Sequence, residues 1–166
     1  KAEDIDTVIL SHYHGDHILG VRNKAGQPVY PNAKIMVPSV EHAFWMDDAR
    51  MAAAPDAMKG AFQTVRRMLG GLGDDRLIKF EAGAEVVPGV KSIAAYGHTP
   101  GHTLFMVESK GEKFAYLADI TNVPQLFARN PDWAVQFDMD AEAARLTRRK
   151  VFDMIANDRV MAGGFH

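Results

Sequence analysis

The pattern of hydrophobic and polar positions along the chain predicts a mixture of short strands and helices. Apolar runs bounded by turn residues are typical of buried strands, and we predict such strands over residues 5–10, 33–37 and 77–81. Apolar residues at spacings of three and four predict helices over residues 39–48, 55–69 and 141–157, with a short helix near residues 18–21. Ser39 and Asp140 are the expected N-caps of the first and last long helices.

The region after residue 77 has the pattern of an antiparallel meander. Short β-type runs occupy residues 77–81, 86–87, 90–96, 103–108 and 114–117, and glycine and proline separate most of them. Residues 160–162 are predicted as a final strand after the last helix. A meander would bring the ends of neighbouring strands side by side. Polar residues that follow those strands therefore become candidates for one site.

Composition narrows the class of protein. The 166 residues suffice for one domain with a core, and 47% hydrophobic with 24% charged residues is typical of an ordinary globular protein. A formal charge of −2 gives no reason to expect nucleic acid or a membrane as partner. Arg145, Arg148, Arg149 and Lys150 cluster on a predicted helix, where we expect them to form a solvated face.

No apolar run approaches the length of about 20 residues that spans a bilayer. We therefore expect a soluble protein, in the cytoplasm or the periplasm, and the sequence leaves the compartment open. The chain has no cysteine, so disulfides and thiolate ligands are excluded. Any metal must be held by nitrogen and oxygen.

Residues 11–20 carry a dense group of candidate metal ligands. His12, His14, Asp16 and His17 fall within six positions directly after an apolar run, and imidazole and carboxylate are ligands of zinc-like ions. On extended backbone His12 and His14 project to the same side, whereas Asp16 and His17 follow Gly15 and point elsewhere. One ion cannot easily use all four, so we expect two adjacent ions. The alternative is a polar loop whose histidines are merely exposed.

Further candidates follow later strands. His98 and His102 lie in the segment Gly-His-Thr-Pro-Gly-His, and Asp119 follows another strand. A lone histidine or aspartate after a strand is usually structural. In a chain that already carries the motif at residues 12–17, a role as metal ligand is favoured instead. His42 has no ligand neighbour in sequence and is expected to be a surface or packing residue.

The motif His-x-His-x-Asp-His resembles the signature of the metallo-β-lactamase fold hydrolases. Residues 114–120, 135–140, the helix from residue 141 and the closing residues 162–166 resemble the branch of that family with methyl parathion hydrolase and lactonase-like enzymes. The resemblance implies an α/β (α+β) fold, an αββα sandwich, with residues 1–166 as one domain of this type. Strands normally precede the motif, so we expect a central portion that lacks N-terminal strands and the C-terminal end. More chain, or a homodimer, would cover the sheet edges.

The resemblance also implies a ligand set. His12, His14 and His98 would hold one divalent ion, Asp16, His17 and His166 a second, and Asp119 would bridge both. His102 would support these ligands by hydrogen bonding. Zinc is the first expectation for the two ions, with manganese, iron or cobalt as alternatives, and no other cofactor is expected.

The expected activity is hydrolysis of a small-molecule ester, lactone or phosphotriester by a metal-bound hydroxide, with Asp16 and Asp119 as candidate catalytic residues. A β-lactamase, a mononuclear iron enzyme of redox or sulfur-oxygenating type, and a non-catalytic metal-binding module are the alternatives. Asn122 stands where some lactonases of this fold have a tyrosine that assists the leaving group. The large residues Trp45, Met46 and Phe127 are expected to form either a substrate wall or core.

Overall fold

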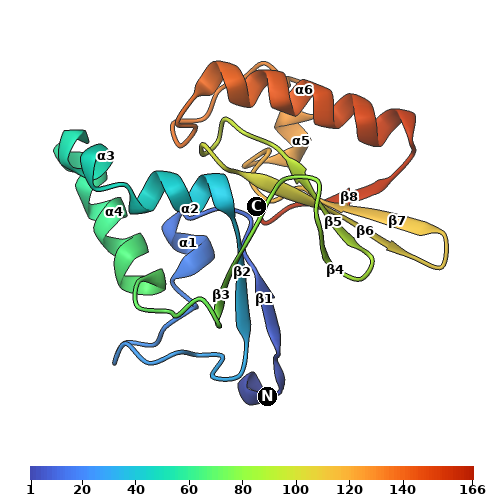
Figure 1. Cartoon of the computed structure of the whole chain (residues 1–166). Coiled ribbons are helices and arrows are strands. Elements are labelled where there is room, and N and C mark those ends of the chain that lie inside the picture. The colour runs from blue at the N-terminus through green and yellow to red at the C-terminus, as the bar shows by residue number, and fades with distance from the viewer. The chain divides into compact units, whose positions relative to one another are not determined.

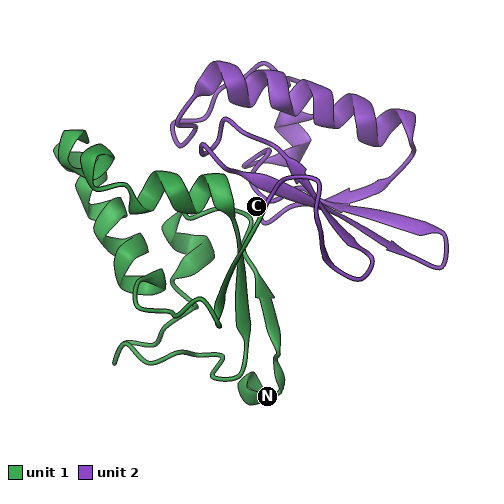
Figure 2. Ribbon diagram, viewed as in Figure 1, with its two compact units in different colours: residues 1–80 green, residues 81–166 purple.

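The computed structural model describes residues 1–166, and the chain divides into two units, residues 1–80 and 81–166 (Figure 2). Each unit contains one sheet and its own helices (Figure 1). The mixed α/β fold class that the sequence predicts is confirmed. None of the helices is both long and apolar enough to cross a membrane.

Three parallel strands form the sheet of the first unit, in the order β1-β2-β3. Parallel neighbours need crossover connections, and helices supply them here. The strands are β1 (Thr7–Ile9), β2 (Lys34–Pro38) and β3 (Leu77–Phe80), and a short 3-10 helix, η1 (Ala2–Asp4), precedes them. The helices are α1 (Gly15–Ile18), α2 (Ser39–Met46), α3 (Asp48–Ala53) and α4 (Asp56–Leu69).

The core of the first unit is aromatic. The Trp45 and Phe62 rings lie 4.8 Å apart between α2 and α4, and both side chains are almost fully buried. Val37 and Val65 are buried in the same unit. Of the two readings open for Trp45, substrate wall or core, the structure favours core.

The helix boundaries of the first unit differ from the predictions in three places. The short helix expected near residues 18–21 begins earlier, at Gly15, so that α1 carries part of the ligand motif. Ser39 is the first residue of α2, not its cap, because Pro38 occupies that position without a side-chain hydrogen bond. The predicted helix over residues 39–48 ends at Met46, where Asp47 accepts a hydrogen bond from the Arg50 amide and starts α3, which was not predicted.

The second unit is built on five strands in the order β4-β5-β6-β7-β8. Strands β4 to β7 form the predicted antiparallel meander, and β8 returns to pair parallel with β7. The strands are β4 (Glu85–Val87), β5 (Val90–Ala94), β6 (Thr103–Ser109), β7 (Glu112–Tyr116) and β8 (Met161–Gly163). The strand predicted over residues 77–81 is not part of this meander, because β3 pairs with β2.

Helix α6 (Ala141–Asn157) lies across one face of this sheet, and the short α5 (Pro124–Phe127) precedes it (Figure 1). Asp140 caps α6 as predicted, since its carboxylate accepts a hydrogen bond from the Ala143 amide. The core between helix and sheet contains Ala95, Leu104, Ala115, Leu117, Ile120 and Val151. Phe127 is also buried, which favours core over substrate wall for that residue.

The predicted solvated face of α6 is right for Arg149 and Lys150, which are exposed, and wrong for Arg148. Arg148 is only 1% exposed. The face of a helix that packs on a sheet is wide enough to include a charged position. A cluster of basic residues in the sequence does not show which of its members lies on that buried face. The guanidinium is hydrogen-bonded inside the unit, which makes its burial tolerable.

Candidate metal centre

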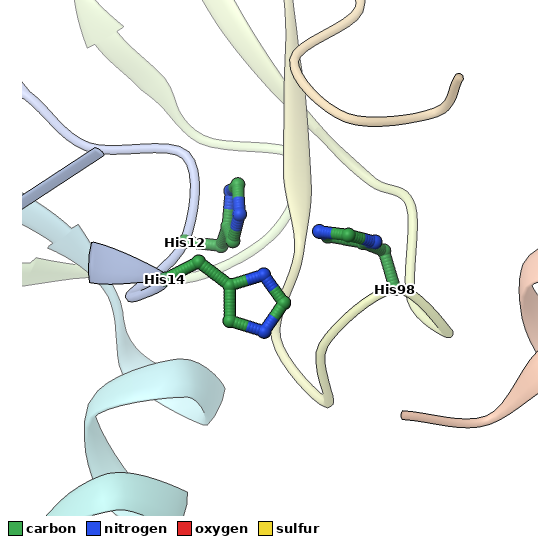
Figure 3. Close-up of side chains that lie close together, drawn as sticks. All are labelled: His12, His14 and His98. Carbon is green, nitrogen blue, oxygen red and sulfur yellow. The ribbon is translucent and has the colours of Figure 1, made fainter. Parts of the chain in front are cut away.

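The ligand motif of the first unit begins where β1 ends. The Leu10 amide donates to the Met36 carbonyl at 2.9 Å, which attaches the segment to β2. His12 is fully buried, and its Nδ1 lies 3.0 Å from Ser11 Oγ, so Nε2 is the ring atom that it can present to a metal. The His12 and His14 ring centroids are 5.0 Å apart, as their shared origin after β1 allows (Figure 3).

Helix α1 carries the second pair of candidate donors. Asp16 lies in its first turn and His17 in its last, with Asp16 Oδ2 3.5 Å from His17 Nε2. The His17 and His12 ring centroids are 4.1 Å apart. Ile18, which is fully buried, anchors the helix. All four donors predicted from the motif thus lie close together within the first unit.

A buried carboxylate holds the backbone of this motif. Glu41 Oε1 accepts a hydrogen bond from the Tyr13 amide at 3.0 Å and one from the Trp45 indole at 2.8 Å. The Tyr13 hydroxyl lies 3.0 Å from His42 Nδ1, so His42 is a packing residue as expected. Burial and the nearby Glu41 carboxylate raise the pKa of Tyr13 far above its usual range. Helix α2 therefore fixes the residue that stands between His12 and His14.

His98 comes from the loop between β5 and β6 in the second unit (Figure 3). The preceding Gly97 has a φ of 127°, a left-handed conformation that other residues rarely adopt. The Gly97 carbonyl accepts from the Asp140 amide at 2.9 Å, and the His98 carbonyl accepts from the Met139 amide at 3.1 Å. The segment that enters α6 therefore holds the backbone of His98.

The His98 ring is oriented by Asp138. Its Nδ1–H donates to Asp138 Oδ1 at 2.9 Å, so Nε2 is the atom that His98 can present to a metal. Burial by itself lowers the pKa of His98, but the hydrogen bonds to Asp119 and Asp138 outweigh it and raise the pKa to about 9. The carboxylate thus increases the basicity of the ring.

Asp119 is placed by an uncommon backbone conformation and by His102. Ala118 has a φ of 48°, in the left-handed region that alanine seldom adopts, and this turns the chain directly after β7. The Asp119 amide donates to His102 Nε2 at 3.1 Å, while His102 Nδ1–H donates to the Ala95 carbonyl at 2.9 Å. Backbone groups thus engage both His102 nitrogens, in the supporting role that the resemblance implied.

The Asp119 carboxylate lies next to two histidines. Its Oδ2 is 3.4 Å from His98 Nε2 and 3.5 Å from His166 Nε2. Imidazole nitrogens and a carboxylate oxygen are donor types suited to zinc-like ions. The residues present in each unit therefore fit the divalent metals that the resemblance implied.

Reasoning from the sequence missed three residues that support these donors: Glu41, Asp138 and Arg148. Glu41 stands in the first turn of a helix, where an acidic residue is explained by the helix dipole alone. Asp138 precedes a helix cap in a loop, and Arg148 lies in a cluster of basic residues. Their partners are 28 or more residues away along the chain, or in a loop of no regular pattern, and no sequence signal identifies such pairs.

Asn122 is half-buried three residues after Asp119, and its Oδ1 is shielded from solvent without a hydrogen-bond partner. An amide does not supply a proton as a tyrosine hydroxyl can. Asn122 therefore cannot assist a leaving group in the way that the tyrosine of some lactonases of this fold does.

The sequence-family model of the metallo-β-lactamase superfamily matches residues 1–162 of the chain. Among curated proteins, the anti-Pycsar protein Apyc1 of Paenibacillus sp. (strain J14) is 30% identical over 135 residues, which are 78% of this chain and 51% of the relative.

Two solved structures resemble the chain over nearly its whole length. The hydrolase AbOPH of the β-lactamase superfamily is 28% identical, with a TM-score of 0.91 over 99% of this chain and 57% of its own. AidC, a dizinc quorum-quenching lactonase in complex with a product, is 29% identical, with a TM-score of 0.90 over 100% of this chain and 58% of its own. The chain thus spans little more than half the length of the relatives that it matches. With its motif, its fold and the family model in agreement, the chain belongs to the metallo-β-lactamase superfamily.

Proposed function

We propose that the protein of which this chain is part is a dinuclear metal-dependent hydrolase that opens lactones or cleaves related esters and phosphotriesters. The observation that carries the proposal is the position of Asp119, whose Oδ2 lies within 3.5 Å of both His98 Nε2 and His166 Nε2. A carboxylate between two histidines is suited to bridge two ions. A lactone is the preferred substrate because the dizinc lactonase AidC is similar over the entire chain.

The proposed ligand set has two halves. His12 and His14 of the first unit, with His98 of the second, would hold one ion. Asp16 and His17, with His166, would hold the other, and Asp119 would contribute to both. The support is the chemistry of the donors, the hydrogen bonds that orient His12 and His98, and the family to which the chain belongs.

When bound, two divalent ions lower the pKa of water toward neutrality and stabilise negative charge that develops on a substrate oxygen. The chain supplies the remaining parts. Asp119 would supply negative charge to both ions. Asp16, whose side chain is about half exposed, is the residue to which we assign proton transfer.

Within the superfamily, we propose that the chain belongs to the branch of the methyl parathion hydrolase and lactonase-like enzymes. The basis is the resemblance of the sequence around Asp119 and in α6. Zinc is the proposed metal, because the ligand set is histidine and carboxylate without thiolate. The substrate is a small molecule.

The test is metal content and hydrolysis in the same samples. Wild type should contain about two zinc-like ions per chain and hydrolyse an N-acyl lactone, with an aryl phosphotriester as second substrate. His17→Ala removes a ligand of the second ion, so the content should fall to about one ion and hydrolysis should fall by a factor of about 100 or more.

His42→Ala is the matched control, because this histidine bonds the Tyr13 hydroxyl and is not a proposed ligand. It should keep both ions. A single iron per chain, unchanged in His17→Ala and without hydrolysis, would overturn the proposal in favour of the redox alternative.

A further inference from the structure

Arg148 is a buried charged residue whose guanidinium makes four hydrogen bonds close to the proposed ligands of the second unit. It lies on α6 and is 1% exposed, although arginine is rarely buried unless it is paired. Its Nε donates to the Ile120 carbonyl at 2.7 Å, and its Nη1 donates to the carbonyls of Pro131 and Trp133 at 2.9 and 2.7 Å. Its Nη2 donates to Asp138 Oδ2 at 3.3 Å.

The first of its two routes to a ligand runs through Asp138. The Asp138 side chain is 1% exposed, and its two oxygens are divided between partners, with Oδ2 toward Arg148 and Oδ1 on His98 Nδ1. A buried carboxylate that loses its cationic partner is left with an uncompensated charge, which favours a shift of the side chain away from its place. The orientation of the His98 ring therefore depends on Arg148.

The second route runs through the backbone beside Asp119. Ile120, whose carbonyl accepts from Arg148 Nε, directly follows Asp119 in the chain. The Asp119 amide is already held by His102 on the other side. One guanidinium thus fixes the segment that carries the carboxylate and, through Asp138, the ring that lies 3.4 Å from it.

The shape of the group explains why an arginine occupies this place. The planar guanidinium presents donors in fixed directions to four oxygens, and it lies over the Phe127 ring, 4.6 Å from its centroid. A lysine ammonium is a single point charge and cannot span these acceptors.

We propose that Arg148 is a positioning residue of the metal centre, which sets His98 through Asp138 and Asp119 through the Ile120 carbonyl. The inference rests on the proposed function in taking His98 and Asp119 as metal ligands. It assigns a role in metal binding to a residue that contacts no ligand atom itself.

The test uses cobalt(II) titration of the metal-free protein, followed by visible absorption, and does not depend on activity. Arg148→Met and Arg148→Lys should each weaken cobalt binding about 10- to 100-fold, as loss of a residue behind a ligand does, and should change the spectrum at saturation. Asp138→Asn should have an effect of the same size. In the double variant Arg148→Met with Asp138→Asn, stability should recover in part because no buried charge is left, whereas cobalt binding should stay weak.

Two controls separate positioning from stability. Val151→Ala removes core volume from the same helix and should lower the melting temperature while cobalt binding stays normal. Arg149→Met alters the neighbouring exposed arginine, which pairs with Asp132, and should change neither. If cobalt affinity instead follows stability through the whole series, including recovery in the double variant, Arg148 is structural only and the proposal is overturned.

A second measurement keeps the inference separate from the proposed function. In the metal-free protein, the His98 Nδ1–H proton held by Asp138 should give a slowly exchanging low-field proton signal, kept in Val151→Ala and lost in Arg148→Met. Retention of that signal in Arg148→Met would overturn the positioning role. A wild type that binds no cobalt, but shows this pattern of proton signals, would overturn the proposed function and leave Arg148 as the residue that orients His98.

Discussion

Hydrogen bonds to ring nitrogens decide which atom each buried histidine presents. Ser11 engages Nδ1 of His12, and Asp138 engages Nδ1 of His98, so both rings present Nε2. His102 differs because backbone groups engage both of its nitrogens. At the scale of residues, the proposed ligand and its supporting neighbour in the segment Gly-His-Thr-Pro-Gly-His are distinguished by their partners.

Tyr13 gives a prediction at the same scale. Because burial and Glu41 raise its pKa, folded Tyr13 stays protonated above pH 10, while the unfolded chain loses this proton. The unfolded state then binds fewer protons than the folded state, so stability falls as pH rises, by up to about 1.4 kcal/mol per pH unit from this group. Tyr13→Phe should remove that contribution.

Urea unfolding of both proteins between pH 8 and 11.5 checks this expectation. The free energies of unfolding should differ by a constant amount up to about pH 10 and then approach each other. Parallel curves over the whole range would show that Tyr13 ionises alike in both states.

At the scale of elements, a few close backbone contacts position two of the proposed ligands, His98 and Asp119. The β5–β6 loop approaches the start of α6 so closely that a Cβ on Gly97 would lie 2.2 Å from the Ala144 nitrogen. The turn after β7 depends on Ala118 in a left-handed conformation. Each of these residues directly precedes a proposed ligand, so element packing and ligand position are coupled.

Gly97→Ala tests this coupling. The substitution meets backbone atoms that cannot move without shifting α6, and it occurs at a φ of 127°, so we expect a loss of about 3 kcal/mol or more in the free energy of unfolding, with weaker metal binding. The matched control is Gly26→Ala, at a φ of 78° with no atom within 4 Å of the new Cβ, which should cost about 1–2 kcal/mol. Equal losses in denaturant unfolding of the two variants would contradict the close-contact argument.

At the scale of the whole molecule, the proposed ligands are divided between residues 1–80 and 81–166. Each unit has its own sheet and its own buried core. In the ligand set that the resemblance implies, the first ion would take His12 and His14 from residues 1–80 and His98 from residues 81–166. Metal binding should therefore stabilise the molecule as a whole.

Thermal melting with and without zinc tests this consequence. Zinc at about 100 times its dissociation constant should stabilise the folded protein by about 2.7 kcal/mol, and a chelator should reverse the effect. His12→Ala and His98→Ala, in different units, should each abolish most of the zinc-dependent shift. Val65→Ala, a buried residue of α4 outside the ligand set, should lower the melting temperature and keep the shift. A normal shift in His98→Ala would count against the proposed sharing of ligands.

Local patterns in the sequence determined much of the fold. The periodic residues of α4 and α6, the Asp140 cap and the turns of the β4–β7 meander follow from short-range spacing and are present as predicted. The ligand motif at residues 12–17 could be identified for the same reason, because its donors are neighbours along the chain. Local signals give the ends of helices only to within a few residues. For that reason the early start of α1 and the separate helix α3 were not predicted.

Only the tertiary structure decided how the donors are supported. Glu41 and Tyr13 are 28 residues apart, and His98 and Asp138 are 40 apart, so their hydrogen bonds exist only after the chain has folded. Arg148 resembled its basic neighbours in sequence and became a buried partner of Asp138 because of where α6 packs. The sequence by itself determined the kind of chemistry, because ligand atoms are properties of residue types. The support of each ligand was decided by tertiary structure, because burial and long-range contacts are properties of the folded chain.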